Sequence, residues 1–316
     1  MSRAPAGADG IVNLLKPAGM SSHDAVDFLR RISGTGRVGH TGTLDPMAVG
    51  VLPLCVGKGT RITEYLAADR KRYRCEMRLG IATDTQDVWG RVNFEAESGF
   101  IARLTERMIA ETAGFFVGPQ MQTPPAYSAV KIGGKKLYEY ARAGKTVDIP
   151  ARGIEIFSLD IKRIDMARGL VVFEAECSKG TYMRTLCHDM GRMLGCGAAM
   201  SGLLRTASGI FALEDAHTVE ALEAAFSSDA LPGGILTALD APLGDFPAVT
   251  LHSEEASAFS HGMRVKTSTH DAARQTAGAR ALCRVYGDTD RRGRVFLGVG
   301  RFGPDALRAE KVLREL

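Results

Sequence analysis

The sequence lacks the features that would define a membrane, secreted or zinc-binding protein. No apolar run approaches the roughly 20 residues that a membrane-spanning helix needs. The first ten residues, MSRAPAGADG, lack the apolar stretch of a signal peptide. Six cysteines are scattered through 316 residues without a CxxC pair, which argues against a zinc site and against a disulfide framework. We therefore expect a cytoplasmic protein with free thiols.

Common catalytic motifs are also missing. The chain has no HExxH, no GxSxG and no group of carboxylates at metal-ligand spacing. GTGRVG, residues 34–39, matches a dinucleotide fingerprint in its letters, but it follows a predicted helix instead of opening one. Cys187, His188 and Asp189 are consecutive in a predicted helix, so their side chains point in different directions. Any chemistry has to come from single residues that distant segments bring together.

Positive charge is present but unevenly distributed. The composition, 45% hydrophobic and 24% charged, is that of a soluble globular protein. The net charge is only +4, yet lysines and arginines gather in residues 58–74 and 131–145. Tyrosines 73, 127, 138 and 140 lie in or near these stretches. Because neutralising phosphates and stacking on bases require these two residue types together, we expect RNA or DNA as a partner.

Hydrophobic periodicity predicts both strands and helices. Residues 73–79 and 170–177 alternate as half-buried strands, and residues 10–15 form a short apolar strand. One helix is predicted to begin at Ser21-Ser22 and to end at Gly34. Two more are expected, from a Thr105 cap to Gly114 and from a Thr181 cap to about Leu194.

The length of 316 residues predicts a large domain followed by a smaller one. Residues 231–246 are rich in Gly, Pro and Asp and are expected to form a linker. A helix at 253–259 follows, and then two alternating strands, 281–286 and 294–300, joined by GDTDRRG. In the large domain, residues 121–150 contain a Gly133-Gly134 hairpin signal and form an excursion from the core.

Three polar residues stand where core packing does not require them. Asp45 lies in RVGHTGTLDPMAVGVLPLCVG, Tyr73 at the start of a strand and Arg184 in the first turn of a helix. By itself, Asp45 followed by proline would be read as a turn. The surrounding glycines favour another interpretation, because they let the backbone approach a ligand or another chain segment. They are Gly39, Gly42 and Gly50.

The same loop resembles a known family. GHTGTLDPMAVGVLPLCVGKGT is similar, nearly residue for residue, to the signature loop of the TruB family of tRNA pseudouridine-55 synthases. Further segments resemble that family in the same order, and the resemblance covers about residues 11–299. These segments are LLKPAGMSSHDAV, KRYRCEMRLGIATDTQDVWG, PPAYSAVKIGGKKLYEYARAG, CSKGTYMRTLCHDMGRMLGCGA and LLRTASGIF.

The resemblance implies an α+β fold of the pseudouridine-synthase type, a mixed and mainly antiparallel sheet with flanking helices. Residues 1–240 would be the catalytic domain, with an RNA-gripping insertion at about 121–150. Residues 246–316 would be a small β-rich, PUA-like RNA-binding domain. The implied enzyme is an isomerase that flips uridine 55 out of the TΨC loop of tRNA and converts it to pseudouridine. The resemblance implies no cofactor, no metal, no membrane contact and no obligate protein partner, and it implies a monomer.

The resemblance also implies catalytic roles. Asp45 matches the nucleophilic aspartate, Arg184 the arginine that pairs with it, and Tyr73 the tyrosine that stacks on the base. The chemistry agrees, because isomerising uridine needs an ionised carboxylate and no redox partner. A nearby arginine favours the charged form of a carboxyl group whose ordinary pKa is about 3.9.

Other positions are implied to bind the substrate. His40 matches the histidine that takes the place of the flipped base in the T-loop. Tyr182 and Leu203 match residues of the base pocket. The expected RNA contacts are Lys16, Lys71, Arg72, Lys131, Lys135, Lys136 and Arg205.

Two other functions remain open from the sequence. A base-exchanging transglycosylase or N-glycosidase also acts at C1′, but it usually needs a second carboxylate, and none is recognisable. A non-catalytic tRNA-binding or tRNA-folding protein would use the same basic groups, with Asp45 as a simple turn residue.

Overall fold

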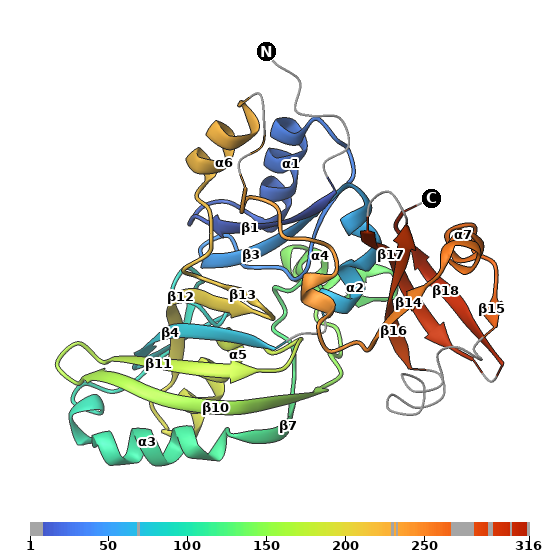
Figure 1. Cartoon of the computed structure of the whole chain (residues 1–316). Coiled ribbons are helices and arrows are strands. Elements are labelled where there is room, and N and C mark those ends of the chain that lie inside the picture. The colour runs from blue at the N-terminus through green and yellow to red at the C-terminus, as the bar shows by residue number, and fades with distance from the viewer. Residues whose placement is uncertain are drawn as a thin grey trace.

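The computed structural model describes residues 9–67, 70–228, 231, 233–266, 281–289, 293–303 and 305–314. Figure 1 shows a large, curved sheet and a smaller sheet beside it. The large sheet has nine strands, in the order β1-β3-β12-β4-β11-β10-β7, with β2 paired to β3 and β13 to β12. These strands are β1 Gly10–Lys16, β2 Val38–His40, β3 Val49–Val56, β4 Lys71–Leu79, β7 Gly118–Gln122, β10 Arg152–Asp165, β11 Leu170–Cys177, β12 Ala198–Ser208 and β13 Phe211–Ala212.

Helices flank this sheet, as an α+β fold requires. In Figure 1, α1 and α6 lie together beside β1, and α3 runs along the opposite end next to β10. The helices of this part of the chain are α1 Ser22–Ser33, α2 Thr63–Leu66, α3 Glu106–Phe115, α4 Leu137–Arg142, α5 Met183–Met193 and α6 Val219–Phe226, with short 3-10 turns at Gly57–Ile62, Ile101–Arg103 and Ala241–Leu243. Within the described residues, no helix is long and apolar enough to cross a membrane.

Local sequence signals explain where α1 begins and ends. The Ser21 side chain accepts a hydrogen bond from Asp24 N, and the Asp24 carboxylate accepts one from Ser21 N, which completes a capping box. Gly34 ends the helix with φ = 67°, a conformation that favours glycine. Both helix boundaries were predicted correctly.

The central strands β4 and β11 pair antiparallel and alternate as predicted. On β4, Tyr73, Cys75 and Met77 face the core, while the residues between them face solvent. On β11, Phe173 is one of the largest fully buried side chains. The alternation places Tyr73 on the buried side of the sheet, at the end where the site lies.

Two predicted helix boundaries were wrong. α3 continues through Gly114 and ends at Phe115, because Gly114 does not take the positive φ with which a glycine ends a helix. α5 begins one residue later than expected, with Tyr182 in the capping position instead of Thr181. Thr181 Oγ1 donates instead to Ser178 O at 2.9 Å, within the turn that precedes the helix.

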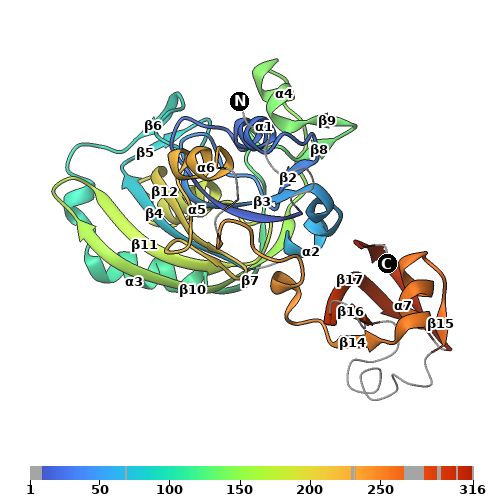
Figure 2. The ribbon, with the colours of Figure 1, turned by 45° about the horizontal axis from the view of Figure 1, so that its top comes forward.

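The excursion after β7 forms a hairpin and a short helix. Gly133 and Gly134, at φ = 56° and 84°, form the turn between β8 Lys131–Ile132 and β9 Lys135–Lys136. The helix α4 follows directly, and Figure 2 shows this segment standing out from the body of the protein. A second small hairpin, β5 Ile81–Thr83 with β6 Val92–Glu95, extends from the end of β4. The Gly133-Gly134 signal therefore predicted the β8–β9 hairpin correctly.

The C-terminal part has its own five-stranded sheet, in the order β14-β16-β17-β18-β15. Its elements are β14 Ala248–Leu251, α7 Ser253–Ser260, β15 Val265–Lys266, β16 Leu282–Thr289, β17 Gly293–Phe302 and β18 Ala306–Val312. The predicted loop GDTDRRG lies partly outside the described residues. Before this sheet, Thr237 exchanges two backbone hydrogen bonds with Ile11, so the expected linker is partly attached to β1.

Candidate active site

The loop that carries Asp45 connects β2 to β3 and is held by side chains from other elements. Ser22 Oγ donates to Leu44 O at 3.0 Å and accepts from Leu44 N at 2.8 Å. Lys16 Nζ donates to Pro46 O at 3.2 Å, so both neighbours of Asp45 are fixed. Because the backbone on each side is bonded, the carboxylate is positioned before any ligand arrives.

Lys16 and Arg205, two of the expected RNA contacts, are both buried in the structure. Lys16 is fully buried, and its ammonium group also donates to Pro17 O and Met20 O. Arg205, only 1% exposed, donates to Val51 O at 2.6 Å and to Gly42 O at 3.2 Å. Both cations bind backbone carbonyls of the Asp45 loop or its flanks and so hold that loop, and Arg205 also lines the cavity beside Asp45.

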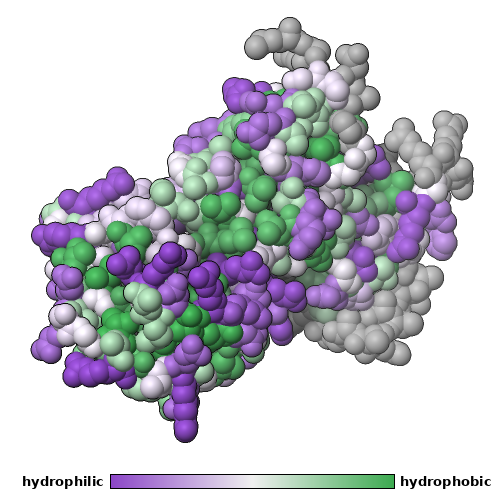
Figure 3. Space-filling view, turned by 90° about the vertical axis from the view of Figure 1, so that its left-hand side faces the viewer, coloured by the Kyte–Doolittle hydropathy of each residue, from purple (hydrophilic) through white to green (hydrophobic). Residues whose placement is uncertain are grey.

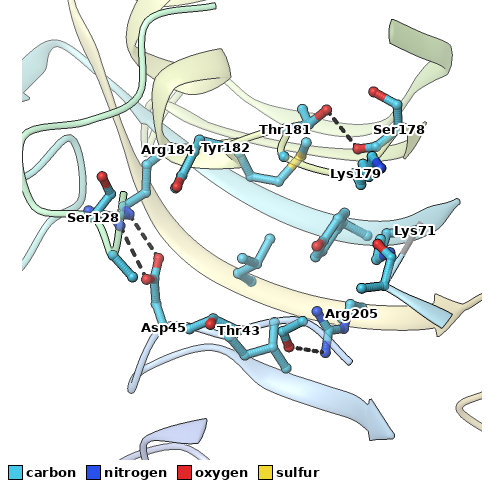
Figure 4. Close-up of a pocket in the computed structure, with 18 of the residues that line it drawn as sticks. Thr43, Asp45, Lys71, Ser128, Ser178, Lys179, Thr181, Tyr182, Arg184 and Arg205 are labelled. Carbon is cyan, nitrogen blue, oxygen red and sulfur yellow. Dashed lines mark hydrogen bonds and ion pairs between the residues drawn. The ribbon is translucent and has the colours of Figure 1, made fainter. Parts of the chain in front are cut away.

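Arg184, from the first turn of α5, meets Asp45. Its Nη2 donates to Asp45 Oδ1 at 3.1 Å, and its Nε lies 2.8 Å from Asp45 Oδ2. The contact between Nε and Oδ2 is an ion pair and not a hydrogen bond, because the N–H of Nε does not point at the oxygen. In Figure 4 the two side chains point toward each other at one end of the cavity. The arginine side chain is 5% exposed and the aspartate 37%, so only the carboxylate reaches solvent.

Backbone carbonyls and a second carboxylate fix the guanidinium group. Nη1 donates to Thr85 O and Nη2 to Tyr127 O, both at 3.0 Å. Asp87 Oδ2 lies 3.9 Å from Arg184 Nη1. Sequence reasoning missed Asp87, because an aspartate in TDTQDVWG is an ordinary turn former. The arginine therefore connects the Asp45 loop, the Thr85 turn and the segment before β8.

A cavity of about 290 Å³ opens beside Asp45 and is lined by Tyr73, Tyr182 and Leu203. Its volume is near the lower end of the roughly 300–1,000 Å³ typical of ligand sites. Burial raises the pKa of the Tyr73 and Tyr182 hydroxyls, so both stay protonated at neutral pH. Figure 4 shows Lys71 and Arg205 across the cavity from Arg184. The structure thus brings the predicted catalytic and pocket residues together.

Two further residues, Thr41 in the cavity wall and Gln122 next to Tyr182, were not recognised in the sequence. Thr41 lines the cavity, and its buried Oγ1 has no hydrogen-bond partner among the described residues. Gln122 holds the start of α5, since its Oε1 accepts from Tyr182 N and its Nε2 donates to Tyr182 O. Neither carries a motif, and only the fold places them here.

His40 lies in a groove that adjoins the cavity and shares Asp45 and Arg184 with it. Burial is the largest effect that lowers the pKa of His40, and the positive charge of Arg205 acts in the same direction. The imidazole is therefore neutral at pH 7. Its Nδ1 has no hydrogen-bond partner among the described residues. Lys136, Tyr138 and Arg142 of the excursion line the same groove.

The remaining basic residues separate into three environments. Lys131 and Lys135 are exposed on the β8–β9 hairpin, open to solvent. Lys71 is buried, donates to Ala67 O at 3.0 Å and lines the cavity. Arg72 follows it on β4 and therefore faces the other side of the sheet, where it pairs with Glu176 at 3.0 Å. Arg72 therefore does not line the cavity.

The glycines around Asp45 have a more limited role than expected. Gly50 has φ = 114°, and a Cβ there would overlap the backbone of Arg205. Gly39 and Gly42 have neither a positive φ nor a neighbour closer than 3.7 Å to an added Cβ. Of these three positions, only Gly50 must be glycine, because its backbone passes close to the backbone of Arg205 on β12.

The architecture itself matches known structures. A chain of a crystal structure titled "Crystal Structure of a Cbf5-Nop10-Gar1 Complex" superposes with a TM-score of 0.71 at 24% identity, covering 97% of this chain and 85% of that one. The fold is that of pseudouridine synthases. Among the described residues, no three His, Cys, Asp or Glu side chains converge to hold a metal ion.

The sequence comparisons are more specific. Residues 30–183 match the model described as TruB family pseudouridylate synthase (N terminal domain), residues 184–242 the tRNA pseudouridylate synthase B C-terminal domain, and residues 247–313 the C-terminal model of pseudouridine synthase II TruB. The tRNA pseudouridine synthase B of Symbiobacterium thermophilum is 46% identical over 265 residues, 83% of this chain and 85% of that protein. That of Burkholderia mallei is 41% identical over 305 residues, 96% of this chain and 97% of that protein. The chain belongs to the TruB family of pseudouridylate synthases, which are isomerases.

Proposed function

We propose that this enzyme converts uridine 55 in the TΨC loop of tRNA to pseudouridine, with Asp45 as the nucleophile and without a cofactor. The observation that carries the proposal is the Asp45–Arg184 pair at the mouth of a cavity lined by Tyr73. Curated relatives with the same family match are named tRNA pseudouridine synthase B, which supports tRNA as the substrate.

The reaction needs one carboxylate. The glycosidic bond between N1 and C1′ breaks and leaves its electron pair on the uracil, which turns so that C5 can bond to C1′. The proton on C5 then leaves, and no atom of the nucleoside is lost except that exchanged proton. Asp45 attacks the flipped nucleotide and is released when the new bond has formed. Arg184 orients the carboxylate throughout, because its own position is fixed by Thr85 O and Tyr127 O.

Before the reaction, the target base has to be flipped out of the RNA loop, and contacts with the enzyme have to offset the free-energy cost. Flipping a base costs a few kcal/mol, and stacking on an aromatic ring such as Tyr73 returns about 1–3 kcal/mol. His40, neutral and half-buried in the adjoining groove, is the side chain we assign to the vacated position in the loop. Lys131, Lys135 and Lys136 on the excursion are the cations we assign to the phosphates.

The division of the chain into a catalytic domain, residues 1–240, and a PUA-like RNA-binding domain, residues 246–316, is part of the same proposal. Each sheet has a separate buried apolar cluster, which supports two units. A third cluster, which includes Ile11, Val51, Val299 and Leu313, packs the second sheet against β1 and β3.

The test is tritium release from an unmodified TΨC stem-loop labelled at C5 of uridine, with no metal or nucleotide added. The wild-type protein is expected to release tritium from one position and to leave pseudouridine in the RNA. Asp45→Asn should bind the RNA with little change and release none. Asp27→Asn, an exposed aspartate of α1 that pairs with Arg30, is the matched control and should remain active. Full activity of Asp45→Asn would remove Asp45 as the nucleophile.

The same assay separates the alternatives. A glycosidase or transglycosylase would free uracil, and a binding protein would release nothing. The second carboxylate that a glycosidase requires was not recognised in the sequence, and the structure does place Asp87 near the site. Its Oδ1 is occupied by Thr85 Oγ1 and Trp89 N, and its Oδ2 is directed at Arg184. Because both oxygens of Asp87 already have partners, Asp87 does not serve as the second carboxylate that a glycosidase requires, and this favours the isomerase.

A further inference from the structure

The only tryptophan of the chain, Trp89, stands in the groove next to the site, and nothing in the reaction above uses it. Trp89 is 49% exposed. Tryptophan is enriched at interfaces, because it combines a large apolar ring with an N–H donor. Its position raises the question of what covers it in the working enzyme.

Exposure alone does not single out Trp89. Phe115 is 77% exposed and Met121 67%, and neither lines the cavity or the groove described above. Figure 3 shows apolar and polar surface interspersed over the side of the molecule that is on the left of Figure 1. Scattered exposed apolar residues are normal on protein surfaces. Trp89 differs from them because it lines the groove that contains Asp45 and Arg184, and it differs from Met47, which is 41% exposed in the same groove, because it has an aromatic ring.

The turn that carries Trp89 is held rigidly. Trp89 N donates to Asp87 Oδ1 at 3.2 Å, and Val88 N donates to Met200 O at 2.9 Å. A side chain at Gly90 would overlap Thr85, so the turn closes tightly behind the indole. Gln86, in the same turn, has φ = 64°, an uncommon backbone conformation for a residue other than glycine. A rigid backbone lowers the entropy cost of using Trp89 as a binding platform.

The groove has the chemistry of a nucleic-acid site. Lys136 and Arg142 line it, and both lie over the ring of Tyr138, at 5.4 and 5.3 Å from the ring centre. His40 and Trp89 add two more flat ring systems. Cations beside aromatic faces suit a single-stranded RNA, whose phosphates and bases need these two kinds of contact. An apolar protein partner would not require the cations.

We infer that Trp89 stacks on an unpaired base of the substrate loop next to the uridine that is isomerised, and so positions the loop on the enzyme. The inference depends on the proposed function, since it assumes an RNA loop in the groove. The isomerised base itself enters the cavity with Tyr73, which Trp89 does not line. Trp89 is therefore a positioning residue for the RNA and has no part in the chemistry.

The experiment uses Trp89 as its own reporter, because the chain has no other tryptophan. Titrating the Asp45→Asn protein with the unmodified stem-loop should quench tryptophan fluorescence with the same midpoint as filter binding. A duplex of the same length without unpaired bases should bind through charge alone and leave the fluorescence unchanged. Loop binding without any change in fluorescence would overturn the inference.

Substitutions provide the second readout. Trp89→Ala should weaken binding of the stem-loop at least about fivefold, because stacking is worth about 1–3 kcal/mol per base. It should raise KM while kcat and the melting temperature stay unchanged, and Trp89→Phe should restore most of the affinity. Phe115→Ala, an exposed aromatic outside the groove, should change nothing. Pseudouridine formation with an unchanged KM in Trp89→Ala would refute only this inference, whereas a wild-type protein that neither binds nor converts the RNA would refute the proposed function as well.

Discussion

Asp87 Oδ2 lies 3.9 Å from Arg184 Nη1, on the same guanidinium group that binds Asp45. One arginine thus serves two carboxylates, one of which faces the cavity while the other is 15% exposed. At this separation and an effective dielectric constant of about 20, the attraction is about 4 kcal/mol before desolvation is subtracted. Asp87 therefore stabilises the arginine in the position from which it holds Asp45.

We predict that Asp87→Asn lowers kcat about tenfold or more and leaves KM nearly unchanged. The amide keeps an oxygen that can accept from Thr85 and Trp89 N, so the turn survives, but the charge on Arg184 is no longer balanced from that side. A displacement of about 1 Å in a reacting group can cost about 100-fold in rate. Single-turnover kinetics on the stem-loop measure the effect.

Asp84→Asn is the matched control for that change. Asp84 lies in the same turn and accepts a hydrogen bond from Arg91 N at 2.9 Å. It lines neither the cavity nor the groove. If Asp84→Asn lowered kcat as much as Asp87→Asn, the effect would belong to the turn and not to the charge at Arg184.

Much of the fold could be predicted because its signals are local. The alternation of β4 and β11 and the capping box at Ser21 depend on residues within a few positions of each other. The pairing of Asp45 with Arg184 spans 139 positions. Periodicity places each residue on an element but does not bring the elements together, and only the family resemblance suggested this contact.

The burial of two cations could not be predicted from the sequence. Lys16 ends an apolar strand and Arg205 lies in a stretch that resembles the family, and neither position indicates that the side chain is buried. Whether a lysine is exposed depends on which carbonyls surround it, and those around Lys16 come from two loops, at residues 17–20 and at Pro46. That convergence follows from the tertiary fold, so composition could not show it.

We predict that Arg205→Met lowers both the stability and the turnover of the enzyme. The substitution leaves Gly42 O and Val51 O without their donor, at about 1–3 kcal/mol for each buried group left unsatisfied. Urea denaturation should show the loss of stability. The salt dependence of RNA affinity should stay unchanged, because Arg205 is only 1% exposed and its guanidinium group is already bound to two backbone carbonyls. A flatter salt dependence with full stability would restore Arg205 as an RNA contact.

We predict the opposite behaviour for Lys135→Ala. Lys135 is exposed at the β8–β9 hairpin, so its loss should cost no stability. Each phosphate contact contributes about 0.7–0.9 to the slope of log affinity against log salt, and the slope should fall by about that amount. Turnover at saturating RNA should be preserved. Lys162→Ala, whose ammonium group pairs with Glu174 on β11, is the control and should leave the slope as it is.

The last prediction concerns pH and Lys16. Burial lowers the pKa of Lys16 to about 8, although the negative charge of Asp45 opposes the shift. The folded-state pKa is thus below the unfolded value of about 10.4, so between these two pH values the unfolded chain binds one more proton than the folded protein. Stability should therefore rise as the pH increases from about 8 toward 10.4.

Lys16→Met removes this titration and isolates its contribution. The variant is expected to be less stable than the wild type near pH 9.5, because Pro46 O and the other carbonyls lose their donor. Near pH 7.5 the difference should be smaller, since the wild type there bears the cost of a buried ammonium group. Urea unfolding of both proteins at the two pH values gives the comparison. A difference that stays constant, or that shrinks as the pH rises, would show that folding does not lower the pKa of Lys16.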